Sequence, residues 1–202
     1  MDNFDQDYFF LKKDENNSRL PFLVPDVNTS ERRFGKIMPL MGSAPLIFEN
    51  GWKNEFLSSH IKDDIADVLF DASSCIVRDP IRERLLKLEL PNVYFHPAIY
   101  VDDQGGWHED FWYLGLRGFF DCWSRTESTY DDEVIEVGDQ KLFSIYTYSL
   151  DSEIIKNTPL QARLLFRMGG TLDGLVTCHK SIATIFRGNG RSGATLQAVV
   201  EY

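Results

Sequence analysis

The segment from Asp102 to Arg125 gathers side chains that could do chemistry. It holds three of the four tryptophans of the chain, and it opens with four carboxylates in nine residues. His108 stands directly before Glu109 and Asp110, and a histidine oriented by a carboxylate is a common general base. The same residue types also suit a solvated hairpin or a protein-binding surface, where tryptophan is enriched.

Other patterns that indicate catalysis or metal binding are weak. The histidines are widely spaced, and the adjacent Cys178 and His179 would point to opposite faces of a strand. The glycine-rich stretch near the C-terminus matches neither a dinucleotide nor a phosphate-binding fingerprint. We therefore expect no metal, no cofactor and no catalytic residue.

Two other classes of function stay open. One is a hydrolase or transferase that uses dispersed carboxylates with His108 or His179. The other is a small-ligand-binding module in which the aromatic side chains stack on a sugar or a base. A deep pocket where these side chains converge would favour the enzyme, and a shallow surface would favour a protein binder.

Cysteine usage and hydropathy indicate the cellular compartment. The chain has three cysteines, odd in number and far apart, so we expect reduced and mostly buried thiols. No apolar run approaches the roughly 20 residues that a membrane helix needs. The first ten residues are acidic and lack the pattern of a signal peptide. We predict a cytoplasmic protein that binds no membrane.

The negative charge is concentrated in one part of the sequence. Between Asp102 and Asp139 there are 11 acids and two bases, which is most of the formal net charge of −10. Such an excess argues against a nucleic-acid partner. It is typical of a solvated loop or of a surface that attracts a basic protein.

Strand and helix patterns predict an α+β fold with a mostly antiparallel sheet and helices packed on one face. Pro80 and the apolar face of Ile81, Leu85 and Leu88 predict a helix from position 80, with Asp79 as its N-cap. This helix lies between two predicted strands, and a similar strand-helix-strand order recurs near the C-terminus. The recurrence is either a degenerate repeat or the chance similarity of two common units.

The strand and turn patterns also predict the structure of the charged segment. Residues 102–106 read as the turn of a hairpin, and the run from Phe111 to Trp123 reads as a central strand covered on both faces. The proline-rich residues 1–45 are expected to form an arm packed on the main body. Residues 46–202 are expected to form one α+β domain.

A resemblance joins several of these segments. The stretch "FWYLGLRGFFDCWSRTESTY", with the flanking "DVLFDASSCIVRDPIRERLLKLEL" and "LLFRMGGTLDGLVTCHKSIATIF", resembles a bacterial immunity-protein family of polymorphic toxin systems. These systems deliver toxins by contact-dependent or type VI secretion, and the family was long catalogued as a domain of unknown function. The resemblance covers roughly residues 65 to 202. Ser124 stands where the family pattern has aspartate.

The resemblance implies a cytoplasmic protein, not an enzyme, that neutralises a cognate toxin by binding it. It also implies structural roles for Asp121, Trp123 and Ser128. We expect a basic toxin as the partner, bound so that its active site is occluded, while a homodimer is also compatible with the sequence. The predicted partner-binding residues are Asp102, Asp103, Trp107, His108, Glu109, Asp110, Asp131, Asp132 and Glu133.

Overall fold

The computed structural model describes residues 4–35, 37–187 and 191–202. It is an α+β fold, mostly sheet, with two main sheets and two short ribbons. The 36% of residues in strands far exceed the 18% in helices, so strand pairing carries the architecture. None of the helices in the described residues is long and apolar enough to cross a membrane.

The larger sheet has six strands in the order β2-β3-β6-β7-β5-β4. Only β3 and β6 pair in parallel, and the other neighbours are antiparallel. The expected mostly antiparallel sheet is therefore confirmed. The strands are β2 (Leu23–Pro25), β3 (Leu46–Asn50), β4 (Val68–Asp71), β5 (Ser74–Arg78), β6 (Val93–Val101) and β7 (Trp107–Leu116).

The smaller sheet has four strands in the order β12-β13-β1-β14. Its strands are β1 (Tyr8–Lys13), β12 (Leu165–Arg167), β13 (Val176–His179) and β14 (Ala194–Ala198). β1 pairs with β13 on one side and with β14 on the other. The prediction that residues 1–45 form an arm lying on the body is therefore wrong for β1, which is an inner strand. The sequence could not show this, because its partners lie more than 160 residues away.

The helices are short, and two of them share one core with both sheets. The helical segments are α1 (Val27–Ser30), α2 (Lys53–Ser58), α3 (Asp79–Leu86), α4 (Ser152–Asn157), α5 (Lys180–Ala183), η1 (Leu160–Arg163) and η2 (Val199–Glu201). Ile81 of α3 and Ile182 of α5 are 2% and 3% exposed in the same apolar cluster. The predicted helix at Pro80 is confirmed, but it begins at Asp79 with Arg78 as its N-cap.

The two strand-helix-strand segments have the same topology. β5-α3-β6 has β7 inserted between its two strands, and β13-α5-β14 has β1 inserted in the same way. Because each inserted strand is antiparallel to both neighbours, the outer strands of each unit run parallel. Both segments are thus split β-α-β units. The sequence shows only that the two segments have the same order of strands and helix. The structure adds that they have the same topology, and this favours a repeat over a chance similarity.

Three apolar clusters fill the molecule. The first lies between the two sheets, and the second lies on the other face of the six-stranded sheet, around Phe48 and Tyr100. The third joins Phe10 and Phe166 of the smaller sheet to Trp123 and Tyr148 of the segment that follows β7. All three cysteines are buried, as expected, and burial raises the pKa of the Cys75 and Cys178 thiols to about 12.

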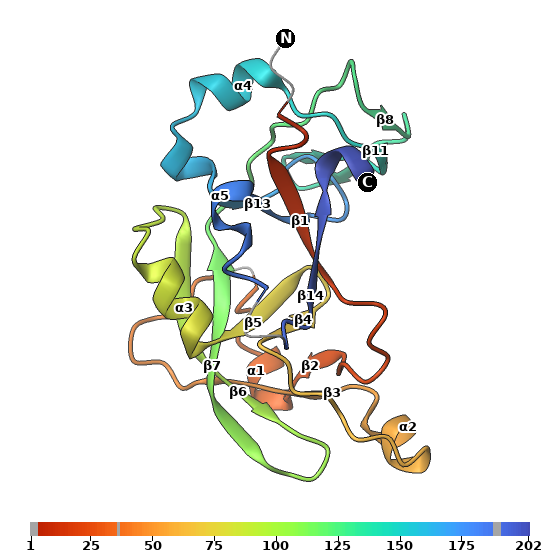
Figure 1. The fold of residues 1–202 in the computed structure, drawn as a ribbon, viewed down its shortest axis with the longest axis vertical. Helices are drawn as coiled ribbons and strands as arrows, with labels where there is room; N and C mark the ends of the chain where they lie inside the picture. The colour runs from red at the N-terminus through yellow and green to blue at the C-terminus, as the bar shows by residue number, and fades with distance from the viewer. Residues whose placement is uncertain (1–3, 36, 188–190) are drawn as a thin grey trace.

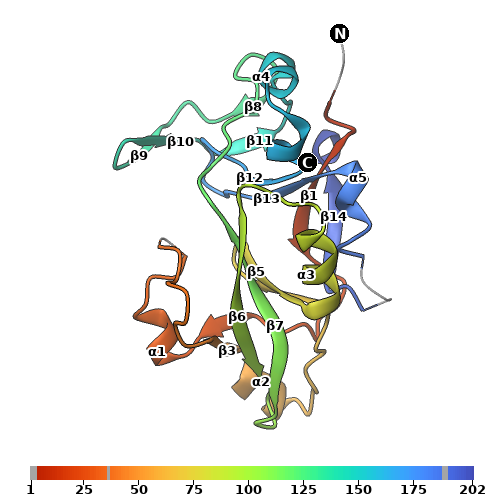
Figure 2. The same ribbon diagram turned by 90° about the vertical axis from the view of Figure 1, so that its left-hand side faces the viewer.

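The charged segment does not lie in one place. Figures 1 and 2 both put the turn between β6 and β7 at one end of the long axis, and the two small ribbons toward the other end. The ribbons pair β8 (Thr129–Tyr130) with β11 (Ile145–Thr147), and β9 (Ile135–Val137) with β10 (Gln140–Leu142). The predicted central strand from Phe111 to Trp123 ends at Leu116, because Arg117 is exposed and Gly118 takes a φ of +73°.

The inner position of β1 has a measurable consequence. Phe10 is fully buried, with its ring centroid 4.9 Å from that of Tyr148. The Phe10→Ala substitution should lower the free energy of unfolding by about 3–5 kcal/mol, as measured by urea denaturation. The control Val27→Ala removes a side chain that is 75% exposed and should change it by less than about 0.5 kcal/mol. Equal effects would contradict a core role for β1.

Candidate functional site

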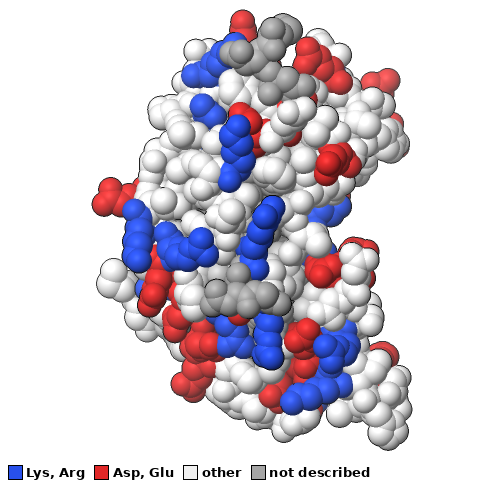
Figure 3. All heavy atoms as spheres, in the orientation of Figure 1, with Lys and Arg blue, Asp and Glu red and all other residues white. Residues whose placement is uncertain are grey.

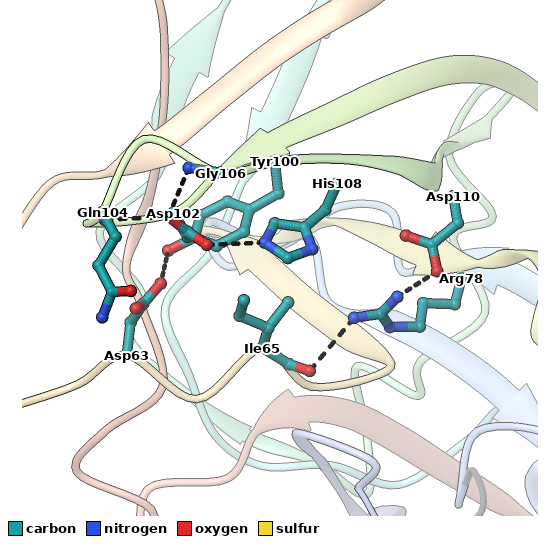
Figure 4. A network of polar contacts seen from close by, with 9 residues as sticks. All are labelled: Asp63, Ile65, Arg78, Tyr100, Asp102, Gln104, Gly106, His108 and Asp110. Carbon is teal, nitrogen blue, oxygen red and sulfur yellow. Dashed lines mark hydrogen bonds and ion pairs between the residues drawn. The ribbon is translucent and has the colours of Figure 1, made fainter.

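The turn between β6 and β7 is held by one carboxylate. Asp102 accepts hydrogen bonds from the backbone N–H groups of Gln104 (2.9 Å) and Gly106 (2.7 Å) through Oδ1. Its Oδ2 lies 2.9 Å from Nε2 of His108. A Cβ atom at Gly106 would lie 2.6 Å from Asp102 Oδ2, so any other residue there would displace this carboxylate from its present contacts. The turn is therefore preorganised by its own side chains (Figure 4).

The electrostatics of this turn follow from these contacts. Burial opposes ionisation of Asp102, but the hydrogen bonds from His108 and from the two backbone N–H groups outweigh it and lower the pKa of the carboxyl group. Asp103 is 7% exposed, and burial raises its pKa although Asn50 Nδ2 donates to it at 3.1 Å. Neighbouring carboxyl groups in one turn thus have opposite shifts.

A second set of polar contacts runs along the same edge (Figure 4). The Tyr100 hydroxyl donates to Asp63 Oδ2 at 2.7 Å, and the Tyr100 ring stacks near His108 with centroids 6.1 Å apart. Arg78 donates to Asp110, forms an ion pair with Asp67 at 3.6 Å and lies over the ring of Phe111. These carboxylates are thus already bonded within the protein.

His108 and Arg78 line a polar depression of about 720 Å³. Arg19, Lys62, Arg187 and Arg191 also line it, together with Asp14, Asp63 and Asp64. Positive and negative side chains therefore both line the depression. Ion pairs such as that of Arg19 with Asp64 (3.8 Å) partly neutralise the two charges. The described residues contain no group of three or more histidine, cysteine or acidic side chains that could hold a metal ion.

Of the predicted hairpin residues, Trp107 and Glu109 remain exposed. Trp107 is 59% exposed. It pairs with Val101 across the hairpin, so it stands on paired backbone and not on a loose loop. Asp102, Asp103 and Asp110 are instead committed to the contacts described above. The hairpin therefore offers a partner one large aromatic side chain and few free charges.

The other predicted acids lie at the far end of the molecule. Asp131 accepts from the Glu133 N–H at 3.1 Å and from the Tyr146 hydroxyl at 3.4 Å. Every residue from Asp132 to Lys141 is exposed, and within the described residues Asp132 and Glu133 have no ion-pair partner. The expected single surface of both acidic groups is therefore wrong. The reason is β7, whose ten residues, at about 3.3 Å per residue, separate them.

His179, the other histidine considered for catalysis, has a structural position. Its Nδ1 accepts from the Ser181 N–H at 3.2 Å, which caps α5. Its ring packs edge-on against Tyr8, and burial lowers its pKa. The structure thus does not bring His179 together with His108.

The motif after Phe120 forms a compact structural network. Trp123 is 1% exposed, and the guanidinium of Arg125 lies 3.7 Å from the centre of its ring. Asp121 holds the same guanidinium, with Oδ2 2.6 Å from Nη2. A Cβ at Gly170 would lie 2.7 Å from both Asp121 Oδ2 and Arg125 Nη2. Two of the three stretches quoted for the family resemblance, those containing Asp121 and Gly170, therefore pack directly on each other.

Ser128 completes this network. Its hydroxyl lies 3.2 Å from the Ser149 carbonyl oxygen, to which it donates, and it accepts from the Ser149 N–H at 2.9 Å. The sequence matches no protein-family model and no curated protein. The roles of this motif are therefore argued from its contacts, some of which are local (Asp121 with Arg125) and some of which join separate segments (Ser128 with Ser149).

The pH dependence of stability tests the role of Asp102. Because its folded-state pKa lies below the usual 3.8, the ionised carboxylate stabilises the fold above that pH, and the contribution is lost as the pH falls through the folded-state value. We expect Asp102→Ala to lower the free energy of unfolding by about 1.5–3 kcal/mol at pH 7 and by less at pH 3. Glu109→Ala, in the same hairpin, should change little. An equal loss at both pH values in urea denaturation would contradict the assignment.

Proposed function

We propose that this protein is a cytoplasmic immunity protein that binds a basic toxin and neutralises it by occluding its active site. The observation that carries the proposal is the difference between committed and free carboxylates. In the hairpin, Asp102, Asp103 and Asp110 are bonded within the fold. Near β9, by contrast, Asp132 and Glu133 are exposed and have no ion-pair partner among the described residues. Free charges attract an oppositely charged partner, and bonded ones contribute far less.

The acids around the ribbon are close together in the sequence. Positions 131 to 142 contain five acids and one base. On the face drawn in Figure 3, by contrast, acidic and basic side chains are interspersed. A basic toxin, such as a nuclease, would be drawn to the ribbon from a distance of about one Debye length, roughly 8 Å at physiological ionic strength. The proposed role needs no cofactor and no bond-making step.

The family-like motif supports the same proposal. In an immunity protein the shared residues maintain the scaffold, and Asp121, Trp123 and Ser128 make contacts of that kind. Surfaces that recognise a particular toxin would then lie outside this motif. The ribbon of β9 and β10, which belongs to neither main sheet, satisfies that condition.

A second candidate function is a hydrolase centred on His108. It is favoured by one observation, the hydrogen bond that Asp102 accepts from His108, a histidine that lines the 720 Å³ depression. The two functions are separated by His108→Ala. A hydrolase would lose its turnover of chromogenic ester and phosphodiester substrates, whereas an immunity protein would show no such turnover and would keep its toxin affinity within about twofold.

Removing the negative charges directly before β9 tests the proposed function. The triple variant Asp131→Asn, Asp132→Asn and Glu133→Gln should slow association with the inactivated toxin domain encoded by the neighbouring reading frame. We expect a fall of about tenfold at low salt and a weaker dependence of the association rate on ionic strength, measured by surface plasmon resonance.

The matched control removes the same charge elsewhere. Glu15, Glu55 and Glu83 are exposed and lie outside the ribbon, so their triple replacement by glutamine should leave the association rate within about twofold. If both triple variants slow association equally, only net charge matters and the ribbon is not the steering surface.

A further inference from the structure

Phe119 is a large apolar side chain held out in solvent. It is 53% exposed. The backbone on either side of it is fixed, because the Arg117 N–H donates to the Asn92 carbonyl oxygen and the Phe120 N–H donates to that of Arg167, both at 2.8 Å. The side chain is therefore presented on a rigid support, which limits the entropy lost when a partner covers it.

Two depressions meet at Phe119. One, of about 250 Å³, continues past Arg117 toward Thr158. The other, of about 480 Å³, runs past Phe143 to Asp139 and Lys141 at the turn of the β9–β10 ribbon. Phe119 thus lies on a ridge between two hollows, and one of them reaches the acidic ribbon.

Exposed apolar side chains lie on two segments that neighbour the residues lining these hollows. Ile135 and Val137 of the ribbon are 46% and 57% exposed. In the other segment, Sδ of Met38 lies 3.4 Å from Arg117 Nη2. Leu40 and Met41, in the same loop, are 80% and fully exposed. Figure 2 shows the ribbon and the loop after α1 projecting on the same side of the molecule.

We call this surface the Phe119 face and define it by Met38, Leu40, Met41, Phe119, Ile135 and Val137. Several large apolar side chains exposed on one side of a molecule are typical of a protein-binding site when charged side chains accompany them. Methionine side chains add adaptability, because they are flexible and polarisable. A two-stranded ribbon standing apart from a larger sheet is marginally stable by itself, so a partner that covers it would also stabilise it.

The charge around the Phe119 face indicates which kind of partner covers it. A second copy of the chain, related by a two-fold axis, would bring the acidic ribbon into the same interface twice. Five acids and one base between positions 131 and 142 make that contact unfavourable. A basic protein with a protruding apolar group fits both features.

We propose that the Phe119 face is the docking surface of the basic toxin, which seats an apolar side chain beside Phe119 while its basic rim meets the ribbon. This inference rests on the proposed function and names the surface that performs it. The acids then govern association, and Phe119 governs dissociation, because a buried anchor is broken only when the complex comes apart. Trp107, at the opposite end, stays outside the interface.

The experiment measures both rate constants with the inactivated toxin domain from the neighbouring reading frame. Phe119→Ala should speed dissociation by about tenfold or more and leave association within about twofold. The matched control is Trp107→Ala, which removes another exposed aromatic side chain and should change neither rate. A second variant, Leu40→Ser with Met41→Ser, should speed dissociation to a smaller extent. Circular dichroism and urea unfolding of each variant should match the parent, since these side chains are exposed.

The outcomes separate the two proposals. Salt-dependent binding with no change in dissociation for Phe119→Ala would overturn the docking surface and keep the immunity function. Faster dissociation for Trp107→Ala alone would move the interface to the hairpin. Failure of the parent protein to bind the toxin would overturn both. A dimer in analytical ultracentrifugation that Phe119→Ala dissociates would identify a second copy as the occupant and contradict the inference.

Discussion

The antiparallel pairing of β6 with β7 is the interaction on which the six-stranded sheet depends. It runs from the pair Val93 and Leu116 to the pair Val101 and Trp107, and both strands have a further neighbour on their outer side. Its two faces contribute to two different apolar clusters, through Leu114 on one side and Phe111 on the other. Because β7 is also continuous with the turn at one end and with the family-like motif at the other, its length sets the distance between the two charged regions.

This geometry explains why a cluster in the sequence becomes two regions with different properties. Near the hairpin, Asp103 and Asp110 lie close to a donor or a cation from another strand, Asn50 and Arg78 respectively. Around the ribbon, Asp132 and Glu133 have no ion-pair partner in the part of the chain that the structure describes, and they are left to solvent. Local charge density in a sequence is therefore a poor guide to electrostatic potential, because compensation depends on which elements are neighbours in space.

Local features of the fold were predictable from particular residues. Asp151 is of a residue type favoured at N-caps, and it accepts from the N–H groups of Glu153 and Ile154 at the start of α4. The turn at 102–106 and the helix at Pro80 follow from the conformational preferences of glycine and proline. Helix starts, caps and tight turns depend on a few neighbouring residues, so they can be predicted from a single sequence.

Non-local features were not predictable in the same way. The pairing of β1 with β13 and β14 is fixed by packing over long separations, which no local pattern encodes. The exposure of Phe119 was missed because it lies within a long apolar run. The Arg117-Gly118 pair is the signal that could have found it, since a charged residue followed by glycine is typical of a strand end.

The position of β1 has a further consequence during synthesis. Lys12 contacts Gln197 across 185 residues of chain, so the last partner strand emerges long after the first. At a translation rate of about 5–20 residues per second, this delay is roughly 10–40 s. During that time β1 has two open hydrogen-bonding edges and a set of unburied aromatic side chains. Until β14 has been synthesised, β1 is vulnerable to aggregation, although its side chains are among the best buried in the finished protein.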